Sequence, residues 1–448
     1  MRIPRYSEVA DDIAGRIRAG VLPAGTRLPT HRALATEHGI AVATATKVYR
    51  ALTEAGMVVG EAGRGTYVRD VSGYAGLEMR RHTPVERVAD LSFNQPLSPD
   101  QGDQLRRTLR ELAAEGDLSA LLMQEPPGGR TRGQAAVATY LLGHGIDVAP
   151  DNVVLTAGGQ QGLDTVLGAV AAPGAVVAVD AVTYPGVKLV AAQRRLELAA
   201  VPSDTAGMAL DHLERLCARR PVSVLYCTPT LHNPLGFVLG DEDRRRLAAL
   251  ARRHDVLIVE DAVYAFLEPG HTPLQALAPE RTFYVGSVSK SMAPGIRFGY
   301  VVAPTRLRDT LIRSLRASSW GTSTLAVALA TRWLTDGTAE RLESSRREDA
   351  GERQRLATTE LAGLQYHAHP ASYLGWLTLP DEARHDVIAR DLAEAGILVT
   401  TADAFATTKR IPNALRLALA TPERADLILA LREIASRIRQ HMPAARPS

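Results

Sequence analysis

Hydrophobic positions repeat at helical spacing in the first seventy residues and at mixed spacing after them, which divides the chain into two parts. Val9, Ile13 and Ile17 recur at steps of four and predict an amphipathic helix, and Thr30 can cap a second one. The expected elements are helices over 6–20, 30–39 and 43–55 and strands over 57–59 and 66–68. Three helices followed by a small hairpin are the order of a winged helix-turn-helix, whose third helix enters the DNA major groove.

Hydroxyl and basic side chains gather on the third predicted helix and beside it. The candidate DNA-binding residues are Arg32, Thr44, Thr46, Lys47, Arg50 and Arg64. A charged helix face is usually only solvated, but the order of helices and the Gly-Arg-Gly wing favour nucleic-acid contact. The text "LPAGTRLPTHRALATEHGIAVATATKVYRALTEAGMVVGEAGRGTYV", residues 22–68, closely resembles the DNA-binding domain of GntR-type regulators. Those regulators often carry arginines early in the recognition helix, where this chain has Val42 and Thr46, so the bases that it reads stay open.

A polar stretch without hydrophobic periodicity separates the two parts. Residues 71–92 contain glycine and proline and are expected to form a linker. The predicted domains are therefore a DNA-binding unit over 1–70, this linker, and a second domain over 93–440.

Apolar runs alternate with helical stretches throughout the second part. The strands expected there include 153–156, 176–179, 222–226, 256–259 and 283–285, and the helices include 162–172, 184–196, 241–254 and 306–317. Such alternation predicts an α/β fold with a mostly parallel sheet and helices on both faces. Ligands bind such sheets at the carboxyl ends of the strands.

The most informative of these strand ends carries a lysine. Ser287, Ser289 and Lys290 follow the last predicted strand, and Arg297 follows a turn. An amine beside hydroxyls and a guanidinium suits a phosphate-bearing aldehyde, because the amine forms a Schiff base while the other groups hold the phosphate. Taken alone, the motif could equally be a strand end with a solvated lysine.

Two further strand ends suit a flat, phosphorylated ligand. Gly159 and Gln160 lie in a glycine-rich turn before a helix, where backbone amides can bind an anion. Tyr184 follows the next strand and could lie over a heteroaromatic ring. Each signal is weak by itself, since glycine is common in such turns and a tyrosine can simply pack at a domain surface.

The remaining motifs suit the polar edge of a pyridine ring. Asn233 stands at a proline turn and could donate to a phenolic oxygen, whereas the neighbouring His232 is expected to be structural. Asp261 ends a buried strand and needs a cationic or donor partner, which a pyridinium nitrogen would supply. Tyr264, three residues on, is placed near the same oxygen.

These elements in this order resemble the fold-type I aminotransferases, which use pyridoxal 5′-phosphate, over residues 91 to 435. The resemblance implies a smaller C-terminal α+β subdomain, an aldimine on Lys290, and a pyridine partner in Asp261. It further implies that Asn233 and Tyr264 hold the phenolic oxygen and that Tyr184 stacks on the ring. The residues that would bind the phosphate are Gly159, Gln160, Ser287 and Arg297.

Near the C-terminus the resemblance assigns one more residue. Arg416, in "PNALRLALA", matches the arginine that grips a substrate carboxylate, a task that suits a bidentate guanidinium. The alternative is a surface arginine on an alternating strand. A GntR-like unit in front of an aminotransferase-like domain is the layout of MocR-type regulators, which this chain resembles over nearly its whole length.

Composition adds few constraints. The net charge of +3 does not require nucleic acid, so a basic surface has to be local. Cys217 and Cys227 are expected to be reduced, no metal site is expected, and no apolar run suits a signal peptide or a membrane span. A cytoplasmic protein with no membrane partner follows as the default.

Three functions remain in competition. The leading one is a transcriptional regulator that senses pyridoxal phosphate, or a small amine or amino acid that forms an aldimine with it. The second is an active aminotransferase with an accessory DNA-binding domain, and the third is a regulator whose second domain only dimerises. Fold-type I sites lie at a subunit interface by family resemblance, so a homodimer that reads operator DNA with two half-sites is expected. A complete set of cofactor residues argues against the third function.

Overall fold

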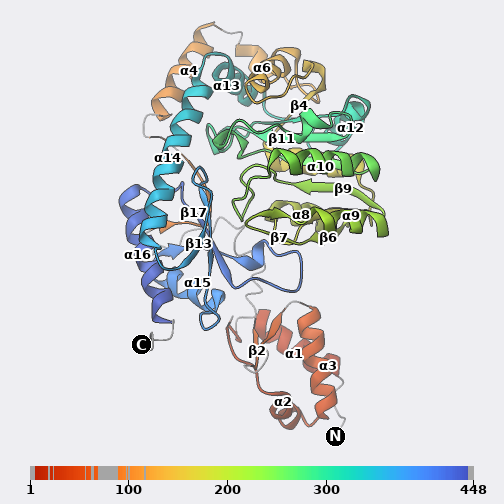
Figure 1. Ribbon diagram of the computed structural model, residues 1–448, viewed down its shortest axis with the longest axis vertical. Coiled ribbons are helices and arrows are strands. Elements are labelled where there is room, and N and C mark those ends of the chain that lie inside the picture. Colours follow the sequence, from red (N-terminus) through yellow and green to blue (C-terminus); the bar gives the residue numbers. More distant parts are fainter. Residues whose placement is uncertain are drawn as a thin grey trace.

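The computed structural model describes residues 6–18, 21–23, 25–55, 57–61, 65–68, 89–96, 98, 101–115 and 118–441. Figure 1 shows three parts along the long axis: a helical unit at the N-terminal end, a mixed subdomain next to it, and a large sheet with its helices at the far end. Within the described residues, none of the helices has the length and apolar character needed to cross a bilayer.

The N-terminal unit is a winged helix-turn-helix, as predicted. Its elements are α1 (Tyr6–Arg18), α2 (His31–His38), α3 (Val42–Glu54), β1 (Val58–Glu61) and β2 (Gly65–Val68). The two strands pair antiparallel. Thr30 caps α2 by accepting a hydrogen bond from the Ala33 amide at 3.2 Å. Val9, Ile13 and Ile17 enter a core made from this unit alone, which the four-residue stripe predicted.

A seven-stranded sheet forms the large domain. In spatial order it contains β4 (Val153–Thr156), β12 (Gly299–Val302), β11 (Thr282–Ser287), β10 (Leu257–Asp261), β9 (Val222–Cys227), β5 (Val176–Asp180) and β6 (Glu197–Val201). Only β12 runs antiparallel to its neighbours, so the prediction of a mostly parallel sheet is confirmed.

Helices cover both faces of this sheet, because successive strand residues point to opposite sides. Val154 packs toward α7 (Gly159–Val170), α8 (Pro185–Arg194) and α12 (Arg308–Ser318). Its neighbours Val153 and Leu155 pack in another core, toward α6 (Thr131–Leu142) and α13 (Thr324–Thr335). The remaining helices of this domain are α4 (Gln101–Glu115), α5 (Leu118–Leu122), α9 (Leu210–Arg219), α10 (Asp241–Arg253) and α11 (Leu274–Leu277).

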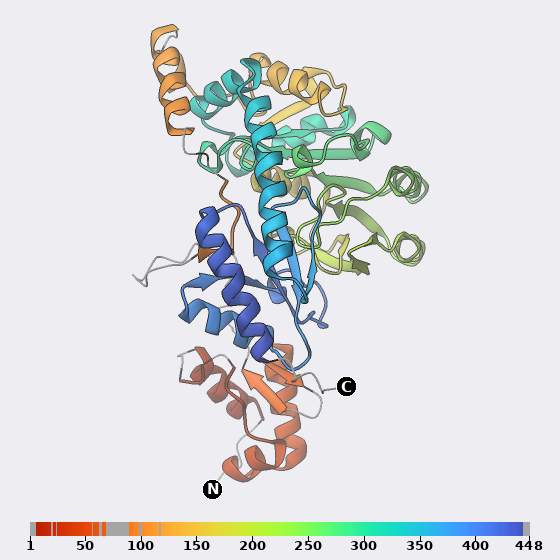
Figure 2. The same cartoon turned by 60° about the vertical axis from the view of Figure 1, so that its left-hand side comes forward.

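The smaller subdomain is α+β, as the resemblance implied. A four-stranded antiparallel sheet has the order β13 (Gln365–His367), β14 (Leu374–Thr378), β17 (Ala414–Ala418) and β16 (Thr400–Thr401). The helices α14 (Thr338–Glu360), α15 (His385–Glu394) and α16 (Arg424–Gln440) belong to it. Figure 2 shows α14 running from the large domain down into this subdomain.

The end of the predicted linker belongs to this subdomain as well. Ala89–Asp90 forms β3, which pairs with β15 (Ile397–Leu398), and Leu91 is fully buried. Residues 71–88, which make up the rest of the predicted linker, lie outside the described residues. The chain is therefore anchored to the small sheet before it enters the large domain.

Candidate functional site

The predicted motifs meet at one edge of the large sheet. Asp261 and Ser287 are the last residues of β10 and β11. Gly159, Tyr184 and Asn233 lie in the segments that follow β4, β5 and β9. Because β4, β5, β9, β10 and β11 share one direction, their carboxyl ends lie along the same edge. The fold thereby brings together residues that lie more than a hundred positions apart in the sequence.

Lys290 lies in a partly buried position beside two arginines. Its Nζ donates to the backbone oxygen of Asn94 at 2.5 Å. Burial lowers the pKa of the Lys290 amine to about 8, and the positive charges of Arg416 and Arg297 lower it further. At pH 7 about a tenth of an amine with this pKa is neutral, far more than for an ordinary lysine, and the neutral form is the nucleophile that attacks a carbonyl.

Asp261 is held at the end of β10 by two donors. The Tyr226 hydroxyl donates to Oδ2 at 2.8 Å, and the Val263 amide donates to Oδ1 at 3.1 Å. Burial raises the pKa of Asp261, and these hydrogen bonds together with His232 counteract the rise. Among the described residues no lysine or arginine acts on this carboxylate. A protonated ring nitrogen would supply a cationic partner for this carboxylate.

His232 is fully buried, in line with the structural role expected for it. Its ring stacks on Phe237 with centroids 4.3 Å apart, and its Nε2 lies 3.3 Å from a carboxylate oxygen of the equally buried Asp180. Asn233 follows it and is 8% exposed, with an amide oxygen that has no hydrogen-bond partner. This unsatisfied polar atom fits a site that is completed by a polar ligand.

Two tyrosines line the same site. The Tyr184 hydroxyl donates to Oε1 of Gln160 at 3.0 Å, and the Gln160 amide nitrogen donates to the Gly186 carbonyl at 3.1 Å. The side chain of Gln160 is thus engaged within the protein, which leaves its backbone amide for an anion. Tyr264 accepts a hydrogen bond from Nδ2 of Asn94 at 3.2 Å, and burial raises its pKa.

The start of α7 packs closely against its neighbours and forms a cradle that can hold an anion. Gly158 has φ +98°, and a Cβ there would lie 2.8 Å from Nη2 of Arg297. A Cβ on Gly159 would lie 2.9 Å from Val263. The first amides of a helix have no intrahelical acceptor, so they and the exposed Arg297 can bind an anion. The Ser287 hydroxyl lies beside them and donates to Oγ of Ser289 at 3.0 Å.

Arg416 is a buried residue of β17, not a surface arginine. It is 6% exposed, and its Nη2 donates to the Ser92 carbonyl at 2.5 Å and to the Thr400 hydroxyl at 3.0 Å. Its guanidinium carbon lies 5.1 Å from the ring centroid of Phe405, while its Nε has no partner. Burial lowers the pKa of Arg416 to about 10. A carboxylate ligand would satisfy the unpaired donor.

Two site residues escaped the sequence reasoning. Asn94 contacts both Lys290 and Tyr264, yet it lies just beyond the polar stretch that was assigned to the linker. Tyr226 ends an apolar run in which a tyrosine is ordinary core material, although its hydroxyl holds Asp261. A polar atom at the carboxyl end of a predicted parallel strand could have identified Tyr226. No comparable sequence signal exists for Asn94, because its contacts depend on tertiary packing.

The predicted DNA-binding residues that the structure describes lie on α2 and α3. Arg32, Lys47 and Arg50 are exposed, and Thr44 is half-buried. The exposed Thr46 hydroxyl contacts Nδ1 of His31 at 3.0 Å, which ties α2 to α3. Arg64 lies outside the described residues. Lys47 and Arg50 thus place two exposed positive charges on α3, which suits contact with DNA phosphates.

Comparison with known proteins identifies both parts. The family model described as "Aminotransferase class I and II" matches residues 86–434, and the one described as "Bacterial regulatory proteins, gntR family" matches residues 5–68. The chain belongs to the aminotransferase class I and II family. It carries a GntR-type DNA-binding unit in front of that domain, so the MocR-type layout is confirmed, and pyridoxal 5′-phosphate is the cofactor that this fold implies.

Its relatives include named regulators as well as enzymes. The "Uncharacterized HTH-type transcriptional regulator YdeF" of Bacillus subtilis is 26% identical over 94% of this chain and 91% of its own length. The "Probable rhizopine catabolism regulatory protein MocR" of Rhizobium meliloti is 27% identical over 75% of this chain and 72% of its own. The structure of an archaeal alanine:glyoxylate aminotransferase covers 80% of this chain and 92% of its own, with 24% identity and a TM-score of 0.75.

Proposed function

We propose that this chain is a transcriptional regulator that binds operator DNA through α3 and its wing and responds to a ligand at the strand-end site. The ligand is pyridoxal phosphate itself, or an amine or amino acid that binds together with it. One observation carries the proposal: a GntR-type unit occurs in one chain with a site that contains a partly buried lysine, an aspartate without a cationic side-chain partner and a buried arginine. A regulator of this kind acts in the cytoplasm.

Each side chain has a proposed task at this site. When bound, pyridoxal phosphate supplies an aldehyde and an electron-withdrawing ring. Lys290 would offer the amine for attachment, and Asp261 would pair with the ring nitrogen. Tyr184 would stack on the ring, and Asn233 with Tyr264 would hold its phenolic oxygen. The proposed phosphate ligands are Gly159, Gln160, Ser287 and Arg297. Arg416 then selects ligands with a carboxylate.

Gel retardation with DNA from upstream of the chain's own gene tests the regulator. We expect specific binding by the full chain, and an affinity that changes when pyridoxal phosphate, alone or with single amino acids, is added. Lys290→Ala should still bind DNA but lose the response, whereas Lys409→Ala, at an exposed position, should behave like the wild type. Identical affinity under all of these conditions would contradict a ligand-responsive regulator.

The aminotransferase alternative is favoured by the completeness of the site. Lys290 has a pKa close to the physiological range, and Arg416 lies near enough to influence it, as an amino-acid site requires. Multiple-turnover amino transfer distinguishes the two functions. The regulator predicts a ligand-dependent change in DNA affinity without sustained turnover, whereas sustained turnover without such a change would favour the enzyme.

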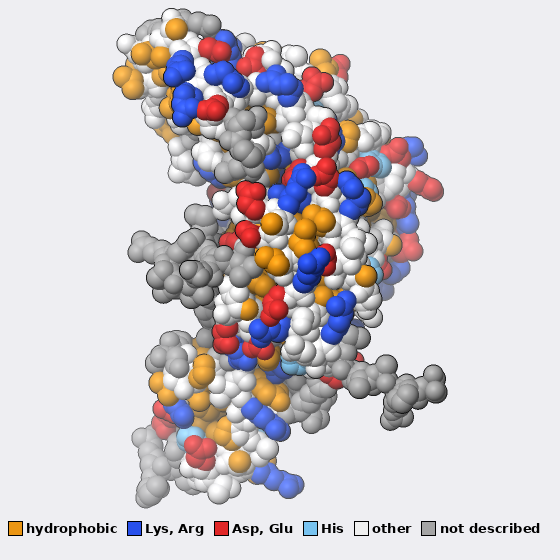
Figure 3. All heavy atoms as spheres, turned by 90° about the vertical axis from the view of Figure 1, so that its left-hand side faces the viewer, with side chains coloured by type: hydrophobic (Ala, Val, Ile, Leu, Met, Phe, Trp, Pro, Cys, Tyr) orange, Lys and Arg blue, Asp and Glu red, His pale blue; other side chains and the backbone are white. Residues whose placement is uncertain are grey.

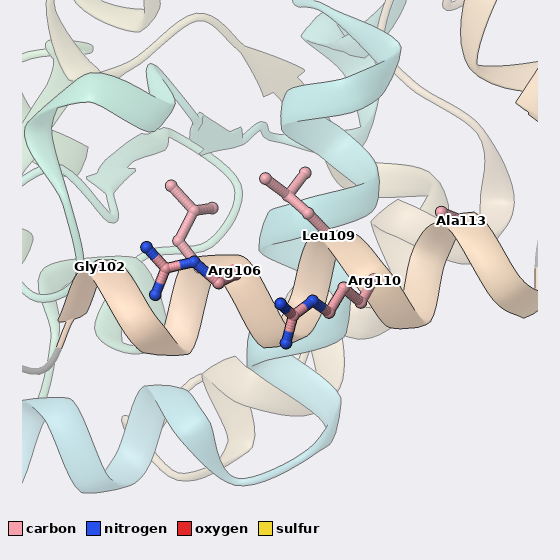
Figure 4. Close-up of a pocket in the computed structure, with 6 residues that line it drawn as sticks. Gly102, Arg106, Leu109, Arg110 and Ala113 are labelled. Carbon is pink, nitrogen blue, oxygen red and sulfur yellow. The ribbon is translucent and has the colours of Figure 1, made fainter.

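A homodimer completes the proposal. Leu109, Leu118, Leu122 and Met123 are large apolar side chains, between 41% and 89% exposed, on α4, on α5 and just after it. A hollow of about 410 Å³ runs along α4 between Gly102 and Ala113 (Figure 4). Figure 3 shows hydrophobic side chains beside basic ones at this end of the molecule. An apolar surface of this kind favours burial against a second copy.

A further inference from the structure

The wing of the DNA-binding unit contacts the smaller subdomain at the start of α15. The guanidinium carbon of Arg384 lies 4.2 Å from the ring centroid of Tyr67 in β2. Gly25, whose amide bonds to the carbonyl of Val68 in β2, is so close to the same helix that a Cβ there would lie 3.0 Å from Nη1 of Arg390. Figures 1 and 2 both show the unit next to this subdomain.

Arg384 is fixed in the position that this contact needs. Asp386 accepts hydrogen bonds from its Nε at 3.0 Å and from its Nη2 at 2.7 Å. Since a bidentate carboxylate holds the guanidinium plane, little side-chain entropy is lost when Tyr67 stacks on it. The contact is therefore a preorganised cation–π pair between two domains.

The start of α15 is attached to the segment 402–407. Nε2 of His385 lies 2.7 Å from Oδ2 of Asp403, and its Nδ1 lies 3.1 Å from Oδ1 of Asn413. The amide oxygen of Asn413 also caps the backbone amide of His385 at 3.0 Å. A shift of the segment 402–407 would consequently move the residue next to Arg384.

The same segment borders the proposed ligand site on two sides. Phe405 lies under the guanidinium of Arg416. Its carbonyl accepts a hydrogen bond from the Thr183 amide at 2.9 Å, and Thr183 precedes Tyr184, the residue proposed to stack on the ring. Arg416 also binds the carbonyl of Ser92, two residues beyond β3, where the chain arrives from the DNA-binding unit. A carboxylate bound to Arg416 would alter its contacts with Ser92 and Phe405.

We propose that the Arg384–Tyr67 contact is a docking latch that fixes the DNA-binding unit on α15. The segment 402–407 changes the strength of this contact when a carboxylate binds Arg416. This regulation rests on the proposed function, because only a DNA-binding unit gains from being repositioned. Coupling between ligand binding and DNA binding requires two separate sites, two arrangements of the protein, and contacts that differ between these arrangements. Here the two sites are the ligand site at Arg416 and the DNA-binding unit, and the two arrangements are the docked and the released unit.

Hydroxyl-radical labelling of Tyr67, read by mass spectrometry in the full chain without DNA or cofactor, tests the latch. Arg384→Ala should raise the labelling rate by roughly two- to fivefold, which corresponds to the loss of one exposed cation–π contact. Arg384→Lys, which keeps a cation, should restore most of the protection. Arg355→Ala, an exposed position on α14, is the matched control and should change nothing. Circular dichroism checks that each variant is folded.

The second arm tests control by the ligand site. Asp403→Asn and Arg416→Lys should each change Tyr67 labelling, and their effects should not add, because both act through one segment. Equal labelling in wild type and Arg384→Ala would overturn the latch. A change in Arg384→Ala without any change in the other two variants would overturn the control by the segment 402–407. Neither result depends on DNA or cofactor binding, so the proposed function would be judged separately by gel retardation.

Discussion

At the scale of single residues, the site is organised by burial of charge. Lys290 and Arg416 have lowered pKa values and Asp261 a raised one, and in each case burial is the largest cause. Keeping these groups out of water costs free energy, which their hydrogen bonds within the protein offset in part and a paired ligand would offset further. The three residues therefore make the strongest tests of the cofactor assignment.

Lys290 should make the stability of the cofactor-free chain depend on pH. Its pKa falls from 10.5 to about 8 on folding. Between these values the unfolded chain binds more protons than the folded one, so the stability of the wild type rises with pH there. Lys290→Met removes this cost, which is fully present below pH 8. We expect the variant to be more stable than the wild type at pH 7, by up to about 3 kcal/mol, and the difference to disappear by about pH 10.5.

Thermal unfolding of the cofactor-free proteins between pH 6.5 and 10.5 measures this effect. Lys409→Met, at an exposed position, is the matched control and should follow the wild type. A constant difference between Lys290→Met and the wild type across this range would show that the amine is not buried as described.

Asp261 should govern cofactor affinity. A carboxylate that bonds a pyridinium makes a charge-assisted hydrogen bond, so Asp261→Asn should weaken the binding of pyridoxal phosphate by about tenfold or more. Tyr184→Phe keeps the ring and loses only the bond to Gln160, so its effect should be smaller. Titration of cofactor absorbance in each variant gives the two affinities, and an unchanged affinity in Asp261→Asn would remove the proposed pairing.

At the scale of elements, the start of α7 decides how the phosphate is bound. The sequence placed this helix from residue 162, whereas it begins at Gly159. The difference arises because Gly158 takes a positive φ that lets the chain turn directly from β4 into the helix. The first free amides of the helix consequently lie at the strand-end edge itself.

Gly159→Ala tests this cradle. Its Cβ would lie 2.9 Å from Val263, so the start of α7 would have to shift and the affinity for pyridoxal phosphate should fall several-fold. Gly15→Ala is the control, since a Cβ at this position of α1, in the separate DNA-binding unit, meets nothing within 4 Å. The test compares the dissociation constants of pyridoxal phosphate for the two variants. Equal constants would argue against a phosphate site at this helix end.

At the scale of the whole molecule, DNA binding should depend on two copies of the N-terminal unit. Each copy has its own core, so residues 1–75 should fold alone. With Lys47, Arg50 and Arg64 of two chains neutralising six phosphates, a plot of log affinity against log salt should have a slope of about −5. The fragment should bind the same operator much more weakly, because it loses the avidity of the dimer.

Footprinting and retardation over a range of salt concentrations measure these quantities. Two protected half-sites are expected for the full chain, in direct or inverted orientation. If the fragment bound as tightly as the full chain, or if the full chain protected a single half-site, the dimeric reader would be wrong.

The sequence by itself determined the local elements and the chemistry that they carry. The spacing of hydrophobic residues located the strand over 153–156, and the residue type at position 30 located the helix cap at Thr30. Both signals are local, because helix caps and buried strands depend on neighbouring residues. Motifs after successive strands pointed to one ligand, since parallel strands end at one edge. Only the tertiary structure revealed Asn94 beneath Lys290, the burial of Arg416, and the Arg384–Tyr67 contact. These features join residues up to several hundred positions apart through packing, and no local pattern of polar and apolar residues records such contacts.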